Sequence, residues 1–147
     1  MRLAGSVTIK APRQKVWEFL TDPHKVAPCA PGIGAVEVIE GGKKFRATAT
    51  IGFGAIKARF TGEAEWMEMD APRRATIRAH GTAAGSAADI AAEMLLAEGA
   101  AGLTELKWTA EVEVMGQLAS VASRLMTPVS RKLTEQFFAS VKKIIEE

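Results

Sequence analysis

The period of the hydrophobic pattern changes along the chain, and this change limits the folds open to it. Between residues 36 and 114 apolar and polar residues alternate, whereas from 117 to 145 apolar residues recur at every third or fourth position. Alternation is typical of strands with one dry and one wet face, and the longer period is typical of an amphipathic helix. A one-sided sheet and a one-sided helix must bury their apolar sides. The pattern therefore predicts an antiparallel sheet whose dry face is covered by one long helix.

Six strands are expected within the alternating region, because glycine or proline breaks divide it into segments. The clearest segments are 55–66 and 104–114, which place Trp66 and Trp108 on the apolar face. Weaker alternation predicts four further strands, at 36–40, 44–51, 74–80 and 87–96.

The N-terminal part adds one strand and two short helices. Residues 3–11 alternate as a strand, and 12–22 show a helical pattern that begins with a proline. Asp22 and Pro23 suit the cap and the first position of a second short helix. The expected fold is therefore α+β of the helix-grip type, in a single domain over 1–147. A curved seven-stranded antiparallel sheet would wrap around the long C-terminal helix, with two short helices after the first strand.

Composition excludes several classes of protein. The chain has 147 residues and a net charge of +2 without a Lys/Arg-rich run, which argues against nucleic acid as a partner. A single cysteine cannot form an internal disulfide, and the N-terminus lacks the apolar core of a signal peptide. No apolar run approaches the roughly 20 residues that cross a bilayer. A cytoplasmic protein is expected.

Small residues dominate the expected dry face of the sheet. By parity the inward positions include Ala47, Ala49, Ala58, Gly62, Ala64, Ala75, Ala79, Ala88, Ala92 and Ala110. Such a face leaves either a pocket for an apolar ligand or, if the helix lies closer, no cavity at all. The helix brings large residues only at every third or fourth position, which favours the pocket.

Few residues of the expected pocket have side chains suited to chemistry. Gln136 and Ser140 interrupt the apolar side of the helix, where they either bond a ligand carbonyl or meet water. His80, Asp89 and Glu93 fall on the wet face by parity. No paired carboxylates, metal-ligand cluster, Ser-His-Asp set or phosphate loop can be assembled from the sequence. No catalytic residue, metal site or covalent cofactor is expected, and the protein is not expected to be an enzyme.

The turns at one end of the predicted meander are apolar and rich in glycine, which marks this end as the mouth of the pocket. Segment 29–34 is expected there, together with Phe53, 81–85 and 115–116. Phe53 lies between two glycines, and it either tucks inward as a lid or touches a membrane or partner.

Cys29 is the only cysteine, and a nearby histidine raises the question of a catalytic pair. His24 falls in the first turn of the second short helix and Cys29 just after its last, so no helical face brings them together. A reactive thiolate needs a cationic neighbour or a helix N-terminus, whereas Cys29 follows a helix C-terminus. We expect Cys29 to be an apolar wall residue near the mouth.

Two motifs carry a resemblance to a known family: Asp-Pro followed by Cys-x-Pro-Gly within 22–32, and Ile-Lys-Ala-Arg-Phe at 56–60. Further matching positions are Gly5, Val16, Trp17, Leu20, Val26, Gly52, Gly81, 86–89, Thr104, Trp108, Phe137 and Phe138. Together they make nearly the whole chain similar to the small CoxG subunit associated with aerobic carbon monoxide dehydrogenase, within the START-like SRPBCC superfamily of helix-grip proteins.

This resemblance implies a non-catalytic protein that binds a hydrophobic molecule, with a respiratory quinone (menaquinone or ubiquinone) as the expected ligand. It also implies service to a molybdenum-containing dehydrogenase complex and transient contact, as a peripheral protein, with the inner face of the cell membrane. Many relatives carry an extension after the helix, whereas this chain ends at Ile-Ile-Glu-Glu. Stable anchoring is therefore not expected, while Lys142 and Lys143 favour transient contact.

Ligand contact is expected from apolar residues of the sheet, of the segment before the second strand and of the helix. These are Val26, Cys29, Pro31, Phe45, Ile51, Phe53, Ile56, Phe60, Ile77, Ile90, Met94, Trp108, Leu118, Leu125, Val129, Leu133 and Gln136. Besides a carrier, the alternatives are a recruitment or assembly factor for the dehydrogenase, or a cyclase- or hydrolase-type enzyme. The apolar inward set disfavours the enzyme, and a fully packed interior would favour the assembly factor.

Overall fold

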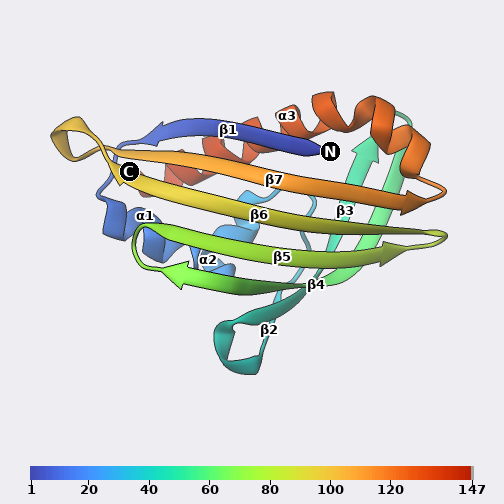
Figure 1. Cartoon of the computed structure of the whole chain (residues 1–147), viewed down its shortest axis with the longest axis horizontal. Coiled ribbons are helices and arrows are strands. Elements are labelled where there is room, and N and C mark those ends of the chain that lie inside the picture. The colour runs from blue at the N-terminus through green and yellow to red at the C-terminus, as the bar shows by residue number, and fades with distance from the viewer. Residues whose placement is uncertain (147) are drawn as a thin grey trace.

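A seven-stranded antiparallel sheet curves over one long helix in the computed structural model, which describes residues 1–146 except for the side chain of Glu40 (Figure 1). The strands are β1 (Arg2–Ile9), β2 (Glu37–Ile39), β3 (Lys44–Phe53), β4 (Ile56–Asp70), β5 (Arg74–Ala83), β6 (Ser86–Glu98) and β7 (Thr104–Gly116). The helices are α1 (Arg13–Leu20), α2 (Pro23–Val26) and α3 (Ala119–Ile145), with short 3₁₀ turns at Ala27–Cys29, Glu40–Gly42 and Ala100–Gly102. The predicted helix-grip α+β fold is confirmed.

The strands lie in the order β1-β7-β6-β5-β4-β3-β2, so the first strand pairs with the last. Most are longer than predicted. Strand β4 continues past Trp66 because the register shifts between Trp66 and Glu68, and this irregularity ends the simple alternation there. Helix α3 begins just after Leu118, whose backbone N–H donates to the Ser86 hydroxyl over 3.0 Å. Pro128 lies inside α3 without interrupting it.

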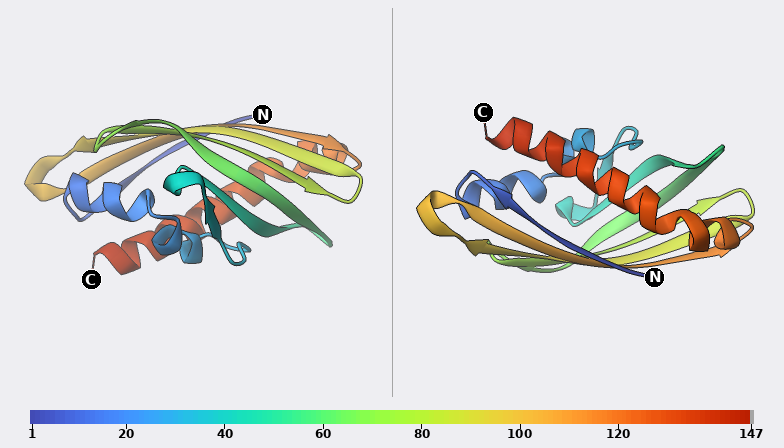
Figure 2. Two further views of the ribbon diagram at one scale, coloured as in Figure 1. Left: turned by 90° about the horizontal axis from the view of Figure 1, so that it is seen from below. Right: turned by 90° about the horizontal axis from the view of Figure 1, so that it is seen from above.

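Helix α3 crosses the concave side of the sheet at an angle (Figure 2). It lies close to the sheet at its N-terminal end and moves away from it toward the C-terminus, where α1 and α2 occupy part of the wedge between them. The outer, convex face of the sheet has no helix over it. All large-scale packing therefore takes place on the concave side, as the period-two pattern predicts.

The first cluster of core residues lies at the α1 end of the wedge. The four apolar residues of α1 that share one side, Val16, Trp17, Phe19 and Leu20, are all buried. They pack with residues of β1, β6, β7 and the last turns of α3, namely Ile9, Leu96, Leu106, Val141 and Ile145. The buried Thr104 hydroxyl donates to the Ala11 carbonyl over 2.6 Å, which ties the start of β7 to the segment before α1.

A second cluster lies at the opposite end, where α3 is closest to the sheet. Its buried members are Phe53, Ala58, Phe60 and Ala122, and apolar residues from the first half of α3 pack against them. The two clusters share no residue.

Strands β4 and β5 approach each other very closely at a pair of facing glycines, Gly62 and Gly81. A Cβ atom at Gly62 would lie 2.2 Å from the His80 carbonyl oxygen, whereas one at Gly81 would meet its nearest neighbour at 3.5 Å. Only Gly62 is therefore required for this approach.

Candidate functional site

An apolar pocket of about 430 Å³ lies between the sheet and the C-terminal half of α3. Its floor comes from β3 to β7 and its roof from α3, and segment 30–33 closes one side. The lining residues are Leu20, Val26, Ala30, Pro31, Ile33, Ala49, Ile51, Trp66, Ala75, Ile77, Ala92, Glu93, Met94, Leu106, Trp108, Thr109, Leu133, Thr134, Phe137 and Phe138. The predicted cavity under the helix is present.

Small residues on the floor create this space. Ala49, Ile77 and Ala92 belong to the floor and to neither packed cluster. On the roof, the rings of Phe137 and Phe138 meet edge to face with centroids 5.0 Å apart. Since α3 moves away from the sheet here, these side chains do not fill the space above the alanines.

Segment 30–33 is held against β3 by backbone hydrogen bonds. The Thr50 N–H donates to the Gly32 carbonyl over 2.9 Å, and the Gly34 N–H donates to the Thr48 carbonyl over 2.8 Å. Gly32 has a φ of 81°, and a Cβ there would lie 2.1 Å from the Thr50 carbonyl oxygen. Glycine is thus needed at this position for Pro31 and Ile33 to reach the pocket wall.

The pocket offers little for chemistry. Glu93 contributes to the lining, but its carboxylate is bound to the Arg74 guanidinium at 2.7 Å. The buried indole N–H of Trp66 has no acceptor among the described residues. This donor is one polar feature of the wall that a ligand with a carbonyl oxygen would satisfy.

The structure brings together seven of the residues predicted to contact a ligand. Val26, Pro31, Ile51, Ile77, Met94, Trp108 and Leu133 line the pocket. Their contact with a ligand stays a prediction.

A second group of predicted residues fills the opposite end of the molecule. Phe53 and Phe60 are buried in the second cluster, and Leu118, Leu125 and Val129 pack against it. Phe53 is only 2% exposed, so it adopts the inward fate. The hairpin end expected to hold the mouth is packed shut, because the first half of α3 lies directly on it.

The remaining predicted residues lie elsewhere. Cys29 is buried in the first cluster, while Phe45 is half-buried in the pair of β3 with β2 and β4, outside the pocket lining. Ile56 and Gln136 are exposed. Ile90 shares the inward register with Met94 but is 37% exposed, and it belongs to a hollow on the outer face.

Cys29 has the character of a core residue. It is 3% exposed, and burial raises the pKa of its thiol. His24 is exposed, and its backbone N–H donates to the Asp22 carboxylate that caps α2. A neutral, enclosed thiol without a neighbouring base is a poor nucleophile.

Several wall residues were absent from the predicted set. The aromatic ones are Trp66, Phe137 and Phe138, and the aliphatic ones include Leu20, Ile33 and Leu106. Trp66 and Leu106 lie on the inward face by parity, so a signal existed for them. Leu20 gave only the signal of a helix core residue, because its distance from the sheet is not readable from the sequence.

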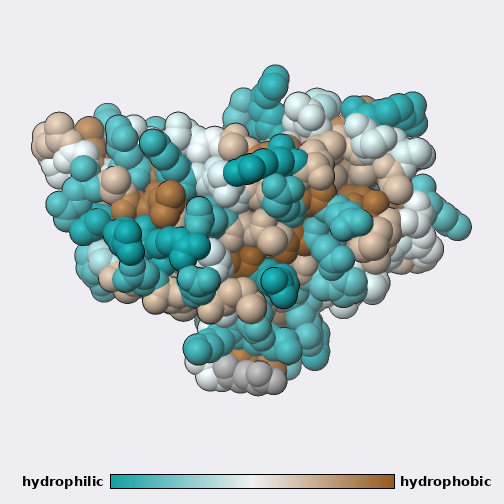
Figure 3. All heavy atoms as spheres, in the orientation of Figure 1, coloured by the Kyte–Doolittle hydropathy of each residue, from teal (hydrophilic) through white to brown (hydrophobic). Residues whose placement is uncertain are grey.

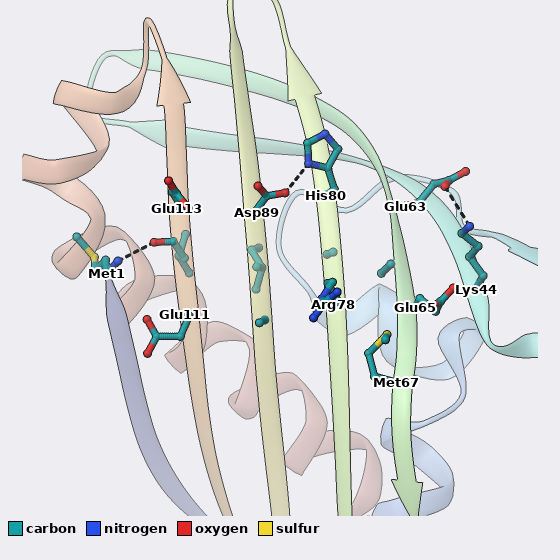
Figure 4. A pocket seen from close by; sticks show the side chains of 15 residues that line it. Met1, Lys44, Glu63, Glu65, Met67, Arg78, His80, Asp89, Glu111 and Glu113 are labelled. Carbon is teal, nitrogen blue, oxygen red and sulfur yellow. Dashed lines mark hydrogen bonds and ion pairs between the residues drawn. The ribbon is translucent and has the colours of Figure 1, made fainter.

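A broader hollow of about 880 Å³ lies on the outer face of the sheet. Hydrophilic side chains cover much of this face, with apolar surface visible between them (Figure 3). Figure 4 shows His80 and Asp89 as an exposed hydrogen-bonded pair, and Lys44 beside Glu63. Arg46 donates to Glu63 over 2.9 Å, and this bond lowers the pKa of the Glu63 carboxyl.

The charges of the outer hollow are thus largely engaged with one another. His80 and Asp89 lie outside the inner pocket, as parity predicts. Within residues 1–146, apart from the side chain of Glu40, no group of three histidine, cysteine or acidic side chains is placed to hold a metal ion. Over the same described part of the chain, no helix is both long enough and apolar enough to cross a bilayer.

Solved structures share this architecture. A conserved protein from Geobacillus kaustophilus is 25% identical, with a TM-score of 0.90 over 99% of this chain and 95% of its own. A protein from Thermus thermophilus is 15% identical, with a TM-score of 0.69 over 99% of this chain and 97% of its own. An aromatase/cyclase from Streptomyces is 17% identical, with a TM-score of 0.67 over 98% of this chain and 95% of its own. The two less similar structures support the fold alone.

Sequence comparison identifies the family. No curated protein sequence gives a significant match. The profile of the family described as the CoxG subunit of carbon monoxide dehydrogenase matches residues 5–146. This match spans nearly the whole chain, including the segment that walls the pocket, both packed clusters and α3. The chain therefore belongs to the CoxG family of carbon monoxide dehydrogenase subunits.

Proposed function

We propose that the protein is a non-catalytic carrier that holds a respiratory quinone, menaquinone or ubiquinone, in the pocket beneath α3. The observation that carries this proposal is the apolar cavity of about 430 Å³ between the alanine-rich floor and the aromatic roof. Transfer of apolar area from water into such a cavity is favourable by about 25 cal/mol per Å² before ordering costs. The protein would keep a water-insoluble molecule in solution without changing it chemically.

A quinone suits the polar character of the wall as well as its size. The indole N–H of Trp66 is buried without an acceptor within the described structure, and such a donor is costly to leave unpaired. A quinone carbonyl that reached it would supply the acceptor while the rest of the ring met apolar side chains. Trp66→Phe should therefore weaken quinone binding more than the binding of a hydrocarbon of similar size.

The family match supports the choice of partner. A family described as a subunit of carbon monoxide dehydrogenase suggests that the carried molecule serves a molybdenum-containing enzyme of that type. Its natural source and destination would be the membrane, which the protein would touch transiently as a peripheral protein on the inner face. Lys142 and Lys143 in the last turns of α3 would favour anionic lipids.

The direct test is native mass spectrometry of gently extracted protein, followed by solvent extraction of the bound molecule. A prenylated quinone should leave with the wild-type protein. Ala92→Leu places a larger side chain on the pocket floor and should remove it, whereas Ala91→Leu on the outer side of β6 should retain it. Recovery of no lipid from the wild-type protein, or equal recovery from both variants, would contradict the proposal.

A reconstituted assay separates the carrier from a recruitment factor. Carbon monoxide-dependent reduction of quinone in vesicles would be measured with the dehydrogenase and either wild-type protein or Ala92→Leu. A carrier loses its effect when the pocket is filled. A recruitment factor would support the reaction equally well with either form, provided that both bind the enzyme.

A further inference from the structure

A second groove, of about 530 Å³, runs between the edge strand β1 and α3. Its apolar wall includes Leu3, Val7 and Ala139, and Arg131, Glu135 and Lys142 give it a polar rim. The groove opens beside the inner pocket and not at the hairpin end, which the second cluster occupies. It is therefore the unfilled apolar surface next to the cavity.

The groove and the inner pocket share part of their walls. Trp108, Thr134 and Phe138 line both, so only these side chains separate the two spaces. Gly5 lies opposite Trp108 in the sheet, and a Cβ there would fall 2.8 Å from the indole Nε1. The absence of a side chain at Gly5 lets the indole lie against β1 at this boundary.

The inner pocket is too small for a long ligand. A volume of about 430 Å³ holds about 14 molecules the size of water, which is close to the number of non-hydrogen atoms in a naphthoquinone ring without a tail. An isoprenoid chain attached to that ring has to leave the pocket. The helix residues that line the groove run from 127 to 142, about 22 Å of helix, which offers a path for several isoprene units.

We propose that the groove between β1 and α3 is a binding site for the tail of a long-chain ligand whose ring lies in the inner pocket, with Trp108 and Phe138 at the passage between them. This inference rests on the proposed quinone-binding function. The tail would lie on Leu3, Val7 and Ala139, and the polar rim would remain in water. The ligand class is thereby narrowed to a ring with a single extended apolar tail.

The test is a competition between menadione, which has no tail, and menaquinones with one, two and four isoprene units, read by native mass spectrometry. Each buried isoprene unit should raise affinity by about tenfold, less than full burial would give because the groove is open on one side. The gain should level off once the groove is filled. Ala139→Trp, at an exposed position in the groove, should remove most of the gain and leave menadione binding unchanged.

The matched control is Ser123→Trp, at an exposed position of α3 outside both linings, which should behave as the wild-type protein. If menadione binds but tail length has no effect, or if Ala139→Trp weakens all ligands equally, the tail site is overturned while the pocket stands. If no quinone binds at all, the proposed function itself is overturned.

Discussion

Filling the inner pocket with protein atoms should stabilise the ligand-free molecule. Ala92 lies on the pocket floor between Ile77 of β5 and Ala110 of β7. Ala92→Leu adds three carbon atoms that enter the cavity, and burial of a methylene group stabilises by about 0.8 kcal/mol. The free energy of unfolding should therefore rise by about 2 kcal/mol. For a chain of this length this corresponds to an increase in Tm of about 4–8 °C.

The same substitution in the packed cluster should have the opposite sign. Ala58 is 6% exposed among Phe53, Phe60 and the first half of α3. Ala58→Leu would force side chains off their preferred rotamers, at a cost of about 1–3 kcal/mol. Urea unfolding followed by circular dichroism measures both values, provided that the dependence on urea concentration is unchanged.

Ligand binding provides the second measurement on the same two variants. Ala92→Leu should weaken binding of an apolar fluorophore such as N-phenyl-1-naphthylamine, whereas folded Ala58→Leu should keep it. If Ala92→Leu destabilises the protein as much as Ala58→Leu does, the space above Ala92 is not free, and the argument for a binding pocket fails.

Three further substitutions or probes test the packing. Gly62→Ala should cost more than about 3 kcal/mol in urea unfolding because its Cβ meets the β5 backbone at 2.2 Å, whereas Gly81→Ala should stay within about 1 kcal/mol; equal effects would contradict the one-sided contact. Thr104→Val should lower stability by about 1–3 kcal/mol, since it leaves the Ala11 carbonyl without its donor, and an unchanged Tm would argue against that bond. Burial raises the pKa of the Cys29 thiol, so its contribution to stability is full below the unfolded value of about 8.5 and is lost as the pH rises through the folded value. Reaction with a thiol reagent at pH 8 should therefore be slow in the native protein and fast in urea, and equal rates would refute the burial.

The hydrophobic period was sufficient to predict the sheet, the long helix and the inward face. Period-two alternation depends only on which side of a strand is dry, so Phe60, Trp66 and Leu106 were assigned to the correct face. The pairing of β1 with β7 is a long-range contact, and nothing in the local pattern of either strand specifies it.

Position along a strand was the part that could not be predicted. Ala58 and Ala92 have the same parity signal, yet the first is packed by α3 and the second faces the pocket. The difference arises from the angle at which α3 crosses the sheet, which periodicity does not report. For the same reason the mouth was placed at the end that contains Phe53, where α3 is closest and the interior is filled.

The separation of the two packed clusters gives the protein a core with a missing piece. Alanines of the floor bury little area on their own, so part of the apolar contact that a domain of this size would normally make internally is left to a bound molecule. Any ligand that fills the gap between the clusters adds stability in proportion to the logarithm of its concentration over its Kd. The loaded and empty forms would then differ in Tm, in hydrogen exchange near segment 30–33 and in resistance to proteases. In a cell this would remove empty molecules faster than loaded ones and couple the amount of the protein to the supply of its ligand.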